Sequence, residues 1–174
     1  TGNEIIVKDG NEGKKFVTLD GVEHTLSEHD LAICNSEEPM CIAGVFGGKG
    51  SGTYETTKNI VLEAAQFHPT WIRKSARRHG LSTDASFRFE RGIDPEGTIY
   101  ALKQAALLCK ELAGGEISME ICDVNPKPFE PARVSLKYNY INSLIGKEIG
   151  VDTIKKIVES LEMKIDSETA EGLE

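Results

Sequence analysis

The sequence predicts an α+β fold, a mixed β-sheet packed with helices, followed by a partial, small and mainly helical domain. Residues 4–34 alternate short apolar runs with turn residues, which is typical of strands. Two longer apolar runs follow at 40–46 and 59–65, and clear helical patterns come only later in the chain. We therefore expect mixed strands covered by helices 69–79 and 95–113.

The first 65 residues supply the expected strands. Residues 4–34 have the pattern of a β meander, with a turn at 20–21. The run at 40–46 is continuously apolar, which favours one strand buried on both faces. The glycine-rich residues 47–52 indicate a loop, and residues 59–65 form a second apolar run interrupted by a single carboxylate.

Two helices follow. The first is predicted over 69–79, because a proline suits its first turn and a glycine follows its last residue. Three of its apolar residues are expected to face the core: Trp71, Ile72 and Ala76. The second helix, 95–113, carries an apolar stripe and ends at two glycines. Residues 83–94 fit no element clearly, and residues 116–124 alternate as a strand does.

A proline-rich segment divides the chain. Residues 126–132 indicate a linker between a domain of residues 1–125 and a partial domain of residues 133–174. The elements expected in this winged-helix-like second domain are a strand at 134–136, helices at 138–145 and 151–161, and a strand at 163–165. Asp152 is expected to cap the second of these helices. So short a domain is expected to be incomplete or to depend on the first.

Composition excludes several classes of protein. The 174 residues include 20 Lys and Arg against 28 Asp and Glu, for a formal net charge of −8, and 39% are hydrophobic. This composition is typical of a globular protein. The net negative charge argues against a protein whose whole surface binds nucleic acid. No apolar run approaches the ~20 residues of a membrane span, and no leader is visible. Because the chain opens on Thr1, we expect a segment of a longer protein.

The cysteines and histidines form no metal-binding pattern. The four cysteines are Cys34, Cys41, Cys109 and Cys122. None forms Cys-x-x-Cys, and no closely spaced histidine pair completes a zinc set, so no metal site is expected. Cys34 and Cys41 fall in apolar stretches, where free cysteine behaves as a small hydrophobe. We expect buried thiols in a reducing cytoplasm, with disulfides as the alternative.

The glycine-rich loop raises the question of nucleotide binding. A P-loop needs Gly-Lys followed directly by Ser or Thr, whose hydroxyl reaches magnesium. Here Lys49 is followed by Gly50, and Ser51 comes one position late. The loop is better interpreted as a hairpin-like turn, or as glycines that let a substrate approach closely.

Glu63 is the carboxylate within the apolar run at 59–65. Burying such a group is costly unless it is paired or protonated. One interpretation is a salt bridge to a nearby arginine, or a solvent-facing position. The other is a polar anchor in an apolar pocket, which would favour a ligand hydroxyl over its hydrogen-only analogue because the anchor otherwise stays unpaired.

A basic face lies on the helix predicted at 69–79. Its cations are Arg73, Lys74, Arg77 and Arg78. This face is either solvated and neutralised by local acids or a contact for one phosphate backbone. Residues 73–91 hold six Lys and Arg against two acids, so any contact with RNA is expected there. The small residues at 83–86 suit either a tight pocket or a plain turn.

Three longer motifs resemble one family closely. They are IAGVFGG, then T-x-x-I-x-L-E-A-A-x-F, then IRKSARRHGLSTDASFRFERGIDP. Together they are similar to the beta subunit of bacterial phenylalanyl-tRNA synthetase, in the module that edits mischarged tRNA. The resemblance covers about residues 1–125. Residues 142–146 and the helix after them resemble the beginning of that subunit's next small helical domain.

The resemblance implies an editing site that hydrolyses the ester of tyrosine wrongly joined to phenylalanine tRNA. The pocket residues that it implies are Ala43, Gly44, Glu63, Thr83 and Ala85, with Glu63 recognising the tyrosine phenol. An ionised carboxylate accepts a hydrogen bond from a phenol, and phenylalanine offers none. The family's water-positioning His and Asn would lie upstream of Thr1. No catalytic residue is therefore expected here, and residues 1–174 alone should be a poor deacylase.

The resemblance also implies the properties of a whole enzyme. It would be an ATP- and magnesium-dependent ligase that joins phenylalanine to tRNA(Phe) in the cytoplasm, assembled with an alpha catalytic subunit. Residues 1–174 are expected to hold no cofactor and to contact tRNA through the basic helix face. The alternative is a non-catalytic module of the same fold that docks tRNA or a protein partner.

Overall fold

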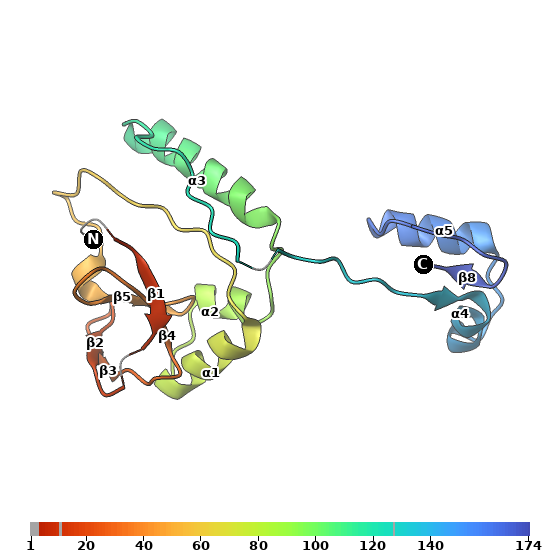
Figure 1. Cartoon of the computed structure of the whole chain (residues 1–174), viewed down its shortest axis with the longest axis horizontal. Helices are drawn as coiled ribbons and strands as arrows, with labels where there is room; N and C mark the ends of the chain where they lie inside the picture. Colours follow the sequence, from red (N-terminus) through yellow and green to blue (C-terminus); the bar gives the residue numbers. More distant parts are fainter. Residues whose placement is uncertain (1–3, 11, 127) are drawn as a thin grey trace. The chain divides into compact units, whose positions relative to one another are not determined.

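The chain has the predicted α+β class. A computed structural model describes residues 4–10, 12–126 and 128–174 (Figure 1). The chain divides into two compact units, the first ending at Val124 and the second running from Asn125 to Glu174.

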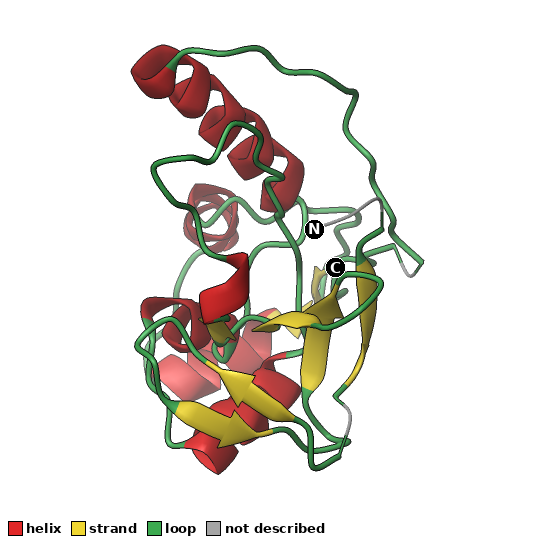
Figure 2. Ribbon diagram, turned by 90° about the vertical axis from the view of Figure 1, so that its left-hand side faces the viewer, coloured by secondary structure: helices red, strands yellow, loops and turns green. Residues whose placement is uncertain are grey.

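The main sheet of the first unit has four antiparallel strands in the order β1-β4-β5-β6. Their bounds are Ile6–Asp9 for β1, Leu31–Cys34 for β4, Pro39–Ile42 for β5 and Phe46–Gly47 for β6. Between β1 and β4 the chain forms a separate hairpin of β2 (Lys15–Val17) and β3 (Glu23–Thr25), drawn with the other strands in Figure 2. The predicted meander is therefore wrong in its pairing, because β1 bonds to β4 rather than to β2.

The apolar run at 40–46 is a hairpin, not the single strand that its pattern predicts. β5 and β6 pair with Ile42 opposite Phe46, and a turn occupies residues 43–45. Gly44 permits this turn because its φ of +65° lies in the left-handed region. The Val45 N–H closes the turn by donating to the Ile42 carbonyl at 2.9 Å.

The strands predicted at 59–65 and 116–124 are not present in the described structure. Both segments lie outside any ladder of hydrogen bonds. In the first of them Ile60 is 53% and Val61 59% exposed. An apolar pattern favours an extended segment, but a strand also needs a neighbouring strand to bond with.

Helix α1 spans Pro69–His79, as predicted, and Gly80 ends it with a φ of +64°. Ile72 and Ala76 pack in the core of the first unit. Trp71 was expected to do the same, but it is 49% exposed. Its ring lies at the surface, where the Lys74 ammonium is 5.2 Å from the ring centre. The core is completed by Phe16, Leu26, Ile33, Ile42, Ala43, Val45 and Phe67.

Helix α2, Asp84–Phe89, lies in the segment that fits no element by pattern. The Thr83 hydroxyl accepts a hydrogen bond from the Ser86 N–H at 3.0 Å. The Ser86 hydroxyl accepts one from the Thr83 N–H at 2.9 Å. This reciprocal capping box defines where the helix begins.

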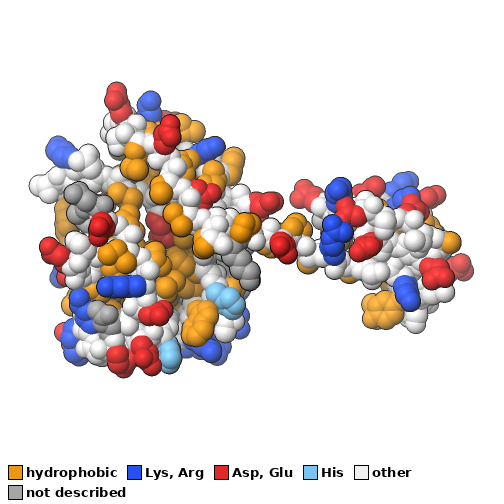
Figure 3. All heavy atoms as spheres, in the orientation of Figure 1, with side chains coloured by type: hydrophobic (Ala, Val, Ile, Leu, Met, Phe, Trp, Pro, Cys, Tyr) orange, Lys and Arg blue, Asp and Glu red, His pale blue; other side chains and the backbone are white. Residues whose placement is uncertain are grey.

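Helix α3 spans Gly97–Ala113, beginning two residues later than predicted. None of its residues is buried, so the expectation that it covers the sheet is wrong. Leu108 is 52% and Leu112 81% exposed. Figure 3 shows that apolar side chains are interspersed with charged ones on the visible face of this unit. None of the described helices is long and apolar enough to cross a membrane.

The second unit is a small α+β assembly. Its elements are β7 (Leu136–Lys137), α4 (Tyr138–Ile145), α5 (Val151–Ser160) and β8 (Gly172–Leu173). The two strands pair antiparallel, and Tyr138, Ile154 and Leu173 form its core. Both helices agree with the prediction.

The strands and one cap of the second unit differ from the prediction. The strand expected at 134–136 is displaced to 136–137, and the one expected at 163–165 is not assigned as a strand. The strand that pairs with β7 is instead β8. With only two residues, β8 has no apolar run by which the sequence could predict it. Gly150 rather than Asp152 occupies the N-cap position of α5.

Candidate functional site

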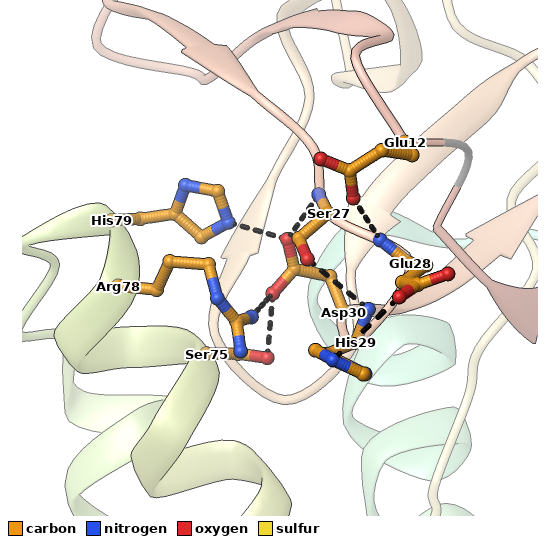
Figure 4. Close-up of polar contacts among 8 residues, drawn as sticks. All are labelled: Glu12, Ser27, Glu28, His29, Asp30, Ser75, Arg78 and His79. Carbon is orange, nitrogen blue, oxygen red and sulfur yellow. Dashed lines mark hydrogen bonds and ion pairs between the residues drawn. The ribbon is translucent and has the colours of Figure 1, made fainter.

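Asp30, which no sequence pattern singles out, has a side chain with no solvent exposure. It lies in the turn before β4 and faces helix α1 (Figure 4). Its Oδ1 accepts a hydrogen bond from the Ser75 hydroxyl at 2.8 Å and pairs with the guanidinium of Arg78. Its Oδ2 accepts from the Ser27 N–H at 2.9 Å and lies 2.7 Å from His79 Nε2.

These contacts determine the charge on Asp30. Burial alone would raise the pKa of its carboxyl. Hydrogen bonds from Ser27 and Ser75, together with His79, outweigh burial and lower the pKa below its ordinary value. Asp30 is therefore an ionised carboxylate held between a turn and a helix. The polar residues at 75, 78 and 79 share one side of α1, and this spacing can be seen in the sequence. The sequence around position 30 gives no sign that Asp30 is their partner.

Ala43 and Gly44 lie in the turn between β5 and β6. Ala43 is 1% exposed, and its N–H donates to the Leu31 carbonyl at 2.8 Å. A Cβ on Gly44 would stand 2.8 Å from a Phe67 ring carbon and 2.9 Å from the Ile72 Cδ1. The inner side of the turn is thus filled by core side chains.

Thr83 and Ala85 lie at the start of α2. The Thr83 hydroxyl donates to the Val45 carbonyl at 2.7 Å, which joins this helix to the β5–β6 turn. Ala85 occupies the first turn of α2 and is exposed. The structure therefore brings Thr83 to Val45, the residue after Gly44, although the two are far apart in sequence.

Glu63 lies in the extended segment at 59–65. Within the described part of the chain, every arginine ion pair joins a carboxylate other than Glu63. Glu63 is exposed, in agreement with the solvent-facing interpretation of this residue, yet partial desolvation raises the pKa of its carboxyl. Burial, and then the Glu63 charge, raise the pKa of the Cys41 thiol to about 11.

The four cations of α1 have different environments. Arg78 is committed to the buried carboxylate described above. Arg73 donates to the backbone carbonyl that follows α2, at 3.0 Å, and Lys74 lies 5.2 Å from the centre of the Trp71 ring. Arg73, Lys74 and Arg77 are solvent-exposed. Arg78, although also partly exposed, therefore differs from the other three cations in being paired with Asp30.

A groove of about 560 Å³ opens beside the glycine-rich loop, between β2, β5 and residues 57–61. None of the five pocket residues implied by the resemblance lines it. The Ser51 hydroxyl donates to the carbonyls of Met40 and Gly48, at 2.7 and 3.1 Å. Lys49–Ser51 form a short 3-10 helix, η1, and no strand follows it in the described residues of the first unit, so the interpretation as a hairpin-like turn is wrong. The Ser51 hydroxyl is turned toward the protein's own backbone.

The cysteines are free thiols, of which Cys34 is buried while Cys122 is exposed. The expectation of burial is therefore wrong for Cys122, which lies in the segment without a strand. Among the described residues, no group of three His, Cys, Asp or Glu is arranged to hold a metal ion.

The fold and these contacts define an α+β domain with a helix pair joined to a β-hairpin turn. Residues 1–114 match the B3/4 domain family, and the chain belongs to it. Its curated relatives carry the name phenylalanine–tRNA ligase beta subunit. The chain is 65% identical to that of Bacteroides fragilis over 172 residues, which are 99% of this chain and 21% of the relative.

More distant relatives carry the same name. Identity is 49% over 168 residues to the subunit of Porphyromonas gingivalis, and 44% over 162 residues to that of Syntrophus aciditrophicus. These matches cover 96% and 92% of this chain and 20% of each relative. The chain thus spans about a fifth of the length of the relatives it matches. The family resemblance seen in the motifs is confirmed.

Proposed function

We propose that residues 1–174 form part of the editing module of a phenylalanine–tRNA ligase beta subunit, which releases tyrosine wrongly joined to tRNA(Phe). The observation that carries the proposal is the state of Glu63. Its carboxylate is accessible, partly desolvated and unmatched by an arginine among the described residues. Such a group accepts a hydrogen bond from a phenol, whereas phenylalanine has no hydroxyl to donate.

The remaining pocket residues are proposed to form the walls. Ala43 and Gly44 contribute a turn without bulky side chains, and the Thr83–Val45 hydrogen bond places the start of α2 beside that turn. Ala85 adds a small, exposed side chain on the same helix. The aromatic ring is proposed to lie against the partly exposed outer side of this turn at Gly44 and against Ala85, with Glu63 supplying the polar contact.

The proposed reaction is hydrolysis of an aminoacyl ester. Water attacks the ester carbonyl carbon, the bond from that carbon to the ribose oxygen breaks, and free tyrosine and tRNA(Phe) result. The groups that position this water are proposed to lie outside residues 1–174. The isolated chain should therefore recognise tyrosine but release it from tyrosyl-tRNA poorly.

Contact with tRNA is proposed for the basic face of α1. Arg73, Lys74 and Arg77 are exposed and can meet phosphates, whereas Arg78 orients the helix through Asp30. The parent enzyme is proposed to work in the cytoplasm with an alpha subunit, and to use ATP and magnesium at a synthetic site outside this chain.

The test is Glu63→Ala in the complete two-subunit enzyme, with Glu55→Ala, an exposed residue of the preceding loop, as the matched control. We expect kcat/KM for release of tyrosine from tyrosyl-tRNA to fall by about 100-fold or more in Glu63→Ala only. Equal affinity of the unmodified enzyme's editing site for tyrosine and phenylalanine would count against Glu63. An enzyme that binds tRNA but never releases tyrosine would favour the non-catalytic module instead.

A further inference from the structure

We propose that Asp30 is a positioning residue of the editing pocket, because its carboxylate joins the two segments that carry the pocket walls. This inference rests on the proposed function. Asp30 immediately precedes β4, the neighbour of the strand that leads into the turn at 43–45, and it binds helix α1, which leads into α2. Figure 4 shows the side chains of Ser75, Arg78 and His79 converging on it from the helix.

The first connection runs through the sheet. The Asp30 backbone is fixed on both sides, since its N–H donates to the Ser27 carbonyl at 3.0 Å and its carbonyl accepts from Gly10 N–H at 2.5 Å. The next residue, Leu31, accepts the hydrogen bond from the Ala43 N–H at 2.8 Å. One wall of the pocket is thus placed by the residue adjacent to Asp30.

The second connection runs through the helices. Ser75, Arg78 and His79 lie in the last two turns of α1, and all three contact the Asp30 carboxylate. Only residues 80–82 separate the end of α1 from Thr83. A rotation or shift of α1 would therefore be transmitted to the start of α2.

The Thr83–Val45 hydrogen bond closes these connections into a ring. Without the Asp30 carboxylate, that single bond and core packing would have to set the distance between the β5–β6 turn and α2. A buried ionic cluster is a weak source of net stability, because desolvation offsets the attraction between its charges. Its directional hydrogen bonds instead restrict geometry, which is what a site selecting one hydroxyl group needs.

The experiment uses the complete two-subunit enzyme with Asp30→Asn and the milder Ser75→Ala. Asn35→Ala is the control, because Asn35 follows β4 as Asp30 precedes it. Its Oδ1 accepts from the N–H groups of Glu37 and Glu38, at 2.8 and 2.7 Å. Release of tyrosine from tyrosyl-tRNA, charging with phenylalanine and the thermal midpoint are measured for each variant.

We expect Asp30→Asn to lower kcat for tyrosine release by about tenfold or more, with KM for tyrosyl-tRNA and the rate of phenylalanine charging within about twofold of the unmodified enzyme. Ser75→Ala should give a smaller loss of the same kind, and Asn35→Ala none. General destabilisation would not lower kcat selectively while leaving the remote synthetic site intact.

Unchanged tyrosine release in a folded Asp30→Asn enzyme would overturn the inference and leave the proposed function standing. If Asp30→Asn does not fold, Ser75→Ala decides, and full activity in that variant overturns the inference. Absence of tyrosine release in the unmodified enzyme would instead refute the proposed function itself, and the positioning role with it.

Discussion

The hydroxyl of Thr83 donates a hydrogen bond of 2.7 Å to the carbonyl of Val45, across 38 positions of sequence. The same oxygen accepts a hydrogen bond from the Ser86 N–H and so begins helix α2. One short side chain therefore acts as donor to a turn and as acceptor for a helix, which a hydroxyl can do at once.

Replacing Thr83 with valine keeps the shape of the side chain and removes both bonds. We expect the free energy of unfolding to fall by about 1–2 kcal/mol, the usual cost of losing an N-cap. Urea denaturation followed by circular dichroism measures the change. Thr83→Ser keeps the hydroxyl and should lose no more than about 0.5 kcal/mol. Equal losses in the two variants would show that the hydroxyl is not the stabilising group.

Elements with local signals could be predicted from the sequence. The bounds of α1 follow from Pro69 and Gly80, and α4 and α5 follow from their apolar spacing. Helical hydrogen bonds join residues four positions apart, so the sequence of the segment itself contains the relevant information.

Elements that depend on distant partners could not be predicted from the sequence. The pairing of β1 with β4 skips an intervening hairpin, and β8 is a two-residue strand that pairs with β7. The apolar stripe of α3 gives its helical state but not its exposure. In the two strand pairings the deciding contact comes from a segment far away in sequence.

The candidate site shows the same division. Glu63 stands out locally, because it is one carboxylate among apolar neighbours. Asp30 does not stand out in its polar turn, although it is the more deeply buried carboxylate. Its significance depends on residues 75–79, more than forty positions later.

The Asp30 carboxylate should make stability depend on pH. Its pKa in the folded chain is lowered from an unfolded value of about 3.9, so its contribution is fully present above about pH 4. That contribution is lost as the pH falls through the folded-state pKa. We therefore expect Asp30→Asn to be less stable than the unmodified chain at pH 7, with the difference shrinking toward pH 2.

Urea denaturation at a series of pH values measures this difference. The exposed Asp123 provides the control, since Asp123→Asn should follow the unmodified chain at every pH. A constant gap between Asp30→Asn and the unmodified chain down to pH 2 would mean that protonation of Asp30 is not the cause.

Cys41 should react slowly with alkylating reagents. Burial, and then the charge of Glu63, raise the pKa of its thiol to about 11, so roughly one molecule in a thousand carries the thiolate at pH 8. Iodoacetamide followed by mass spectrometry should therefore modify the exposed Cys122 first. Glu63→Gln removes the charge and should speed modification of Cys41, while Glu55→Gln should not. No change in Glu63→Gln would place Glu63 out of electrostatic range of β5.

Gly44 and Gly80 offer a matched pair that separates backbone strain from steric exclusion. Their φ values are +65° and +64°, so an alanine at either site bears the same left-handed strain of about 1 kcal/mol. Around Gly80 no atom lies within 4 Å of an added Cβ, whereas at Gly44 the Cβ would meet Phe67 and Ile72 below 3.0 Å. We expect Gly44→Ala to lose a further ~1–3 kcal/mol of unfolding free energy, because those core side chains must shift. Equal losses of unfolding free energy in the two variants, measured by urea denaturation, would mean that the β5–β6 turn can shift without cost. The pocket wall proposed there would then not be held in place by the core.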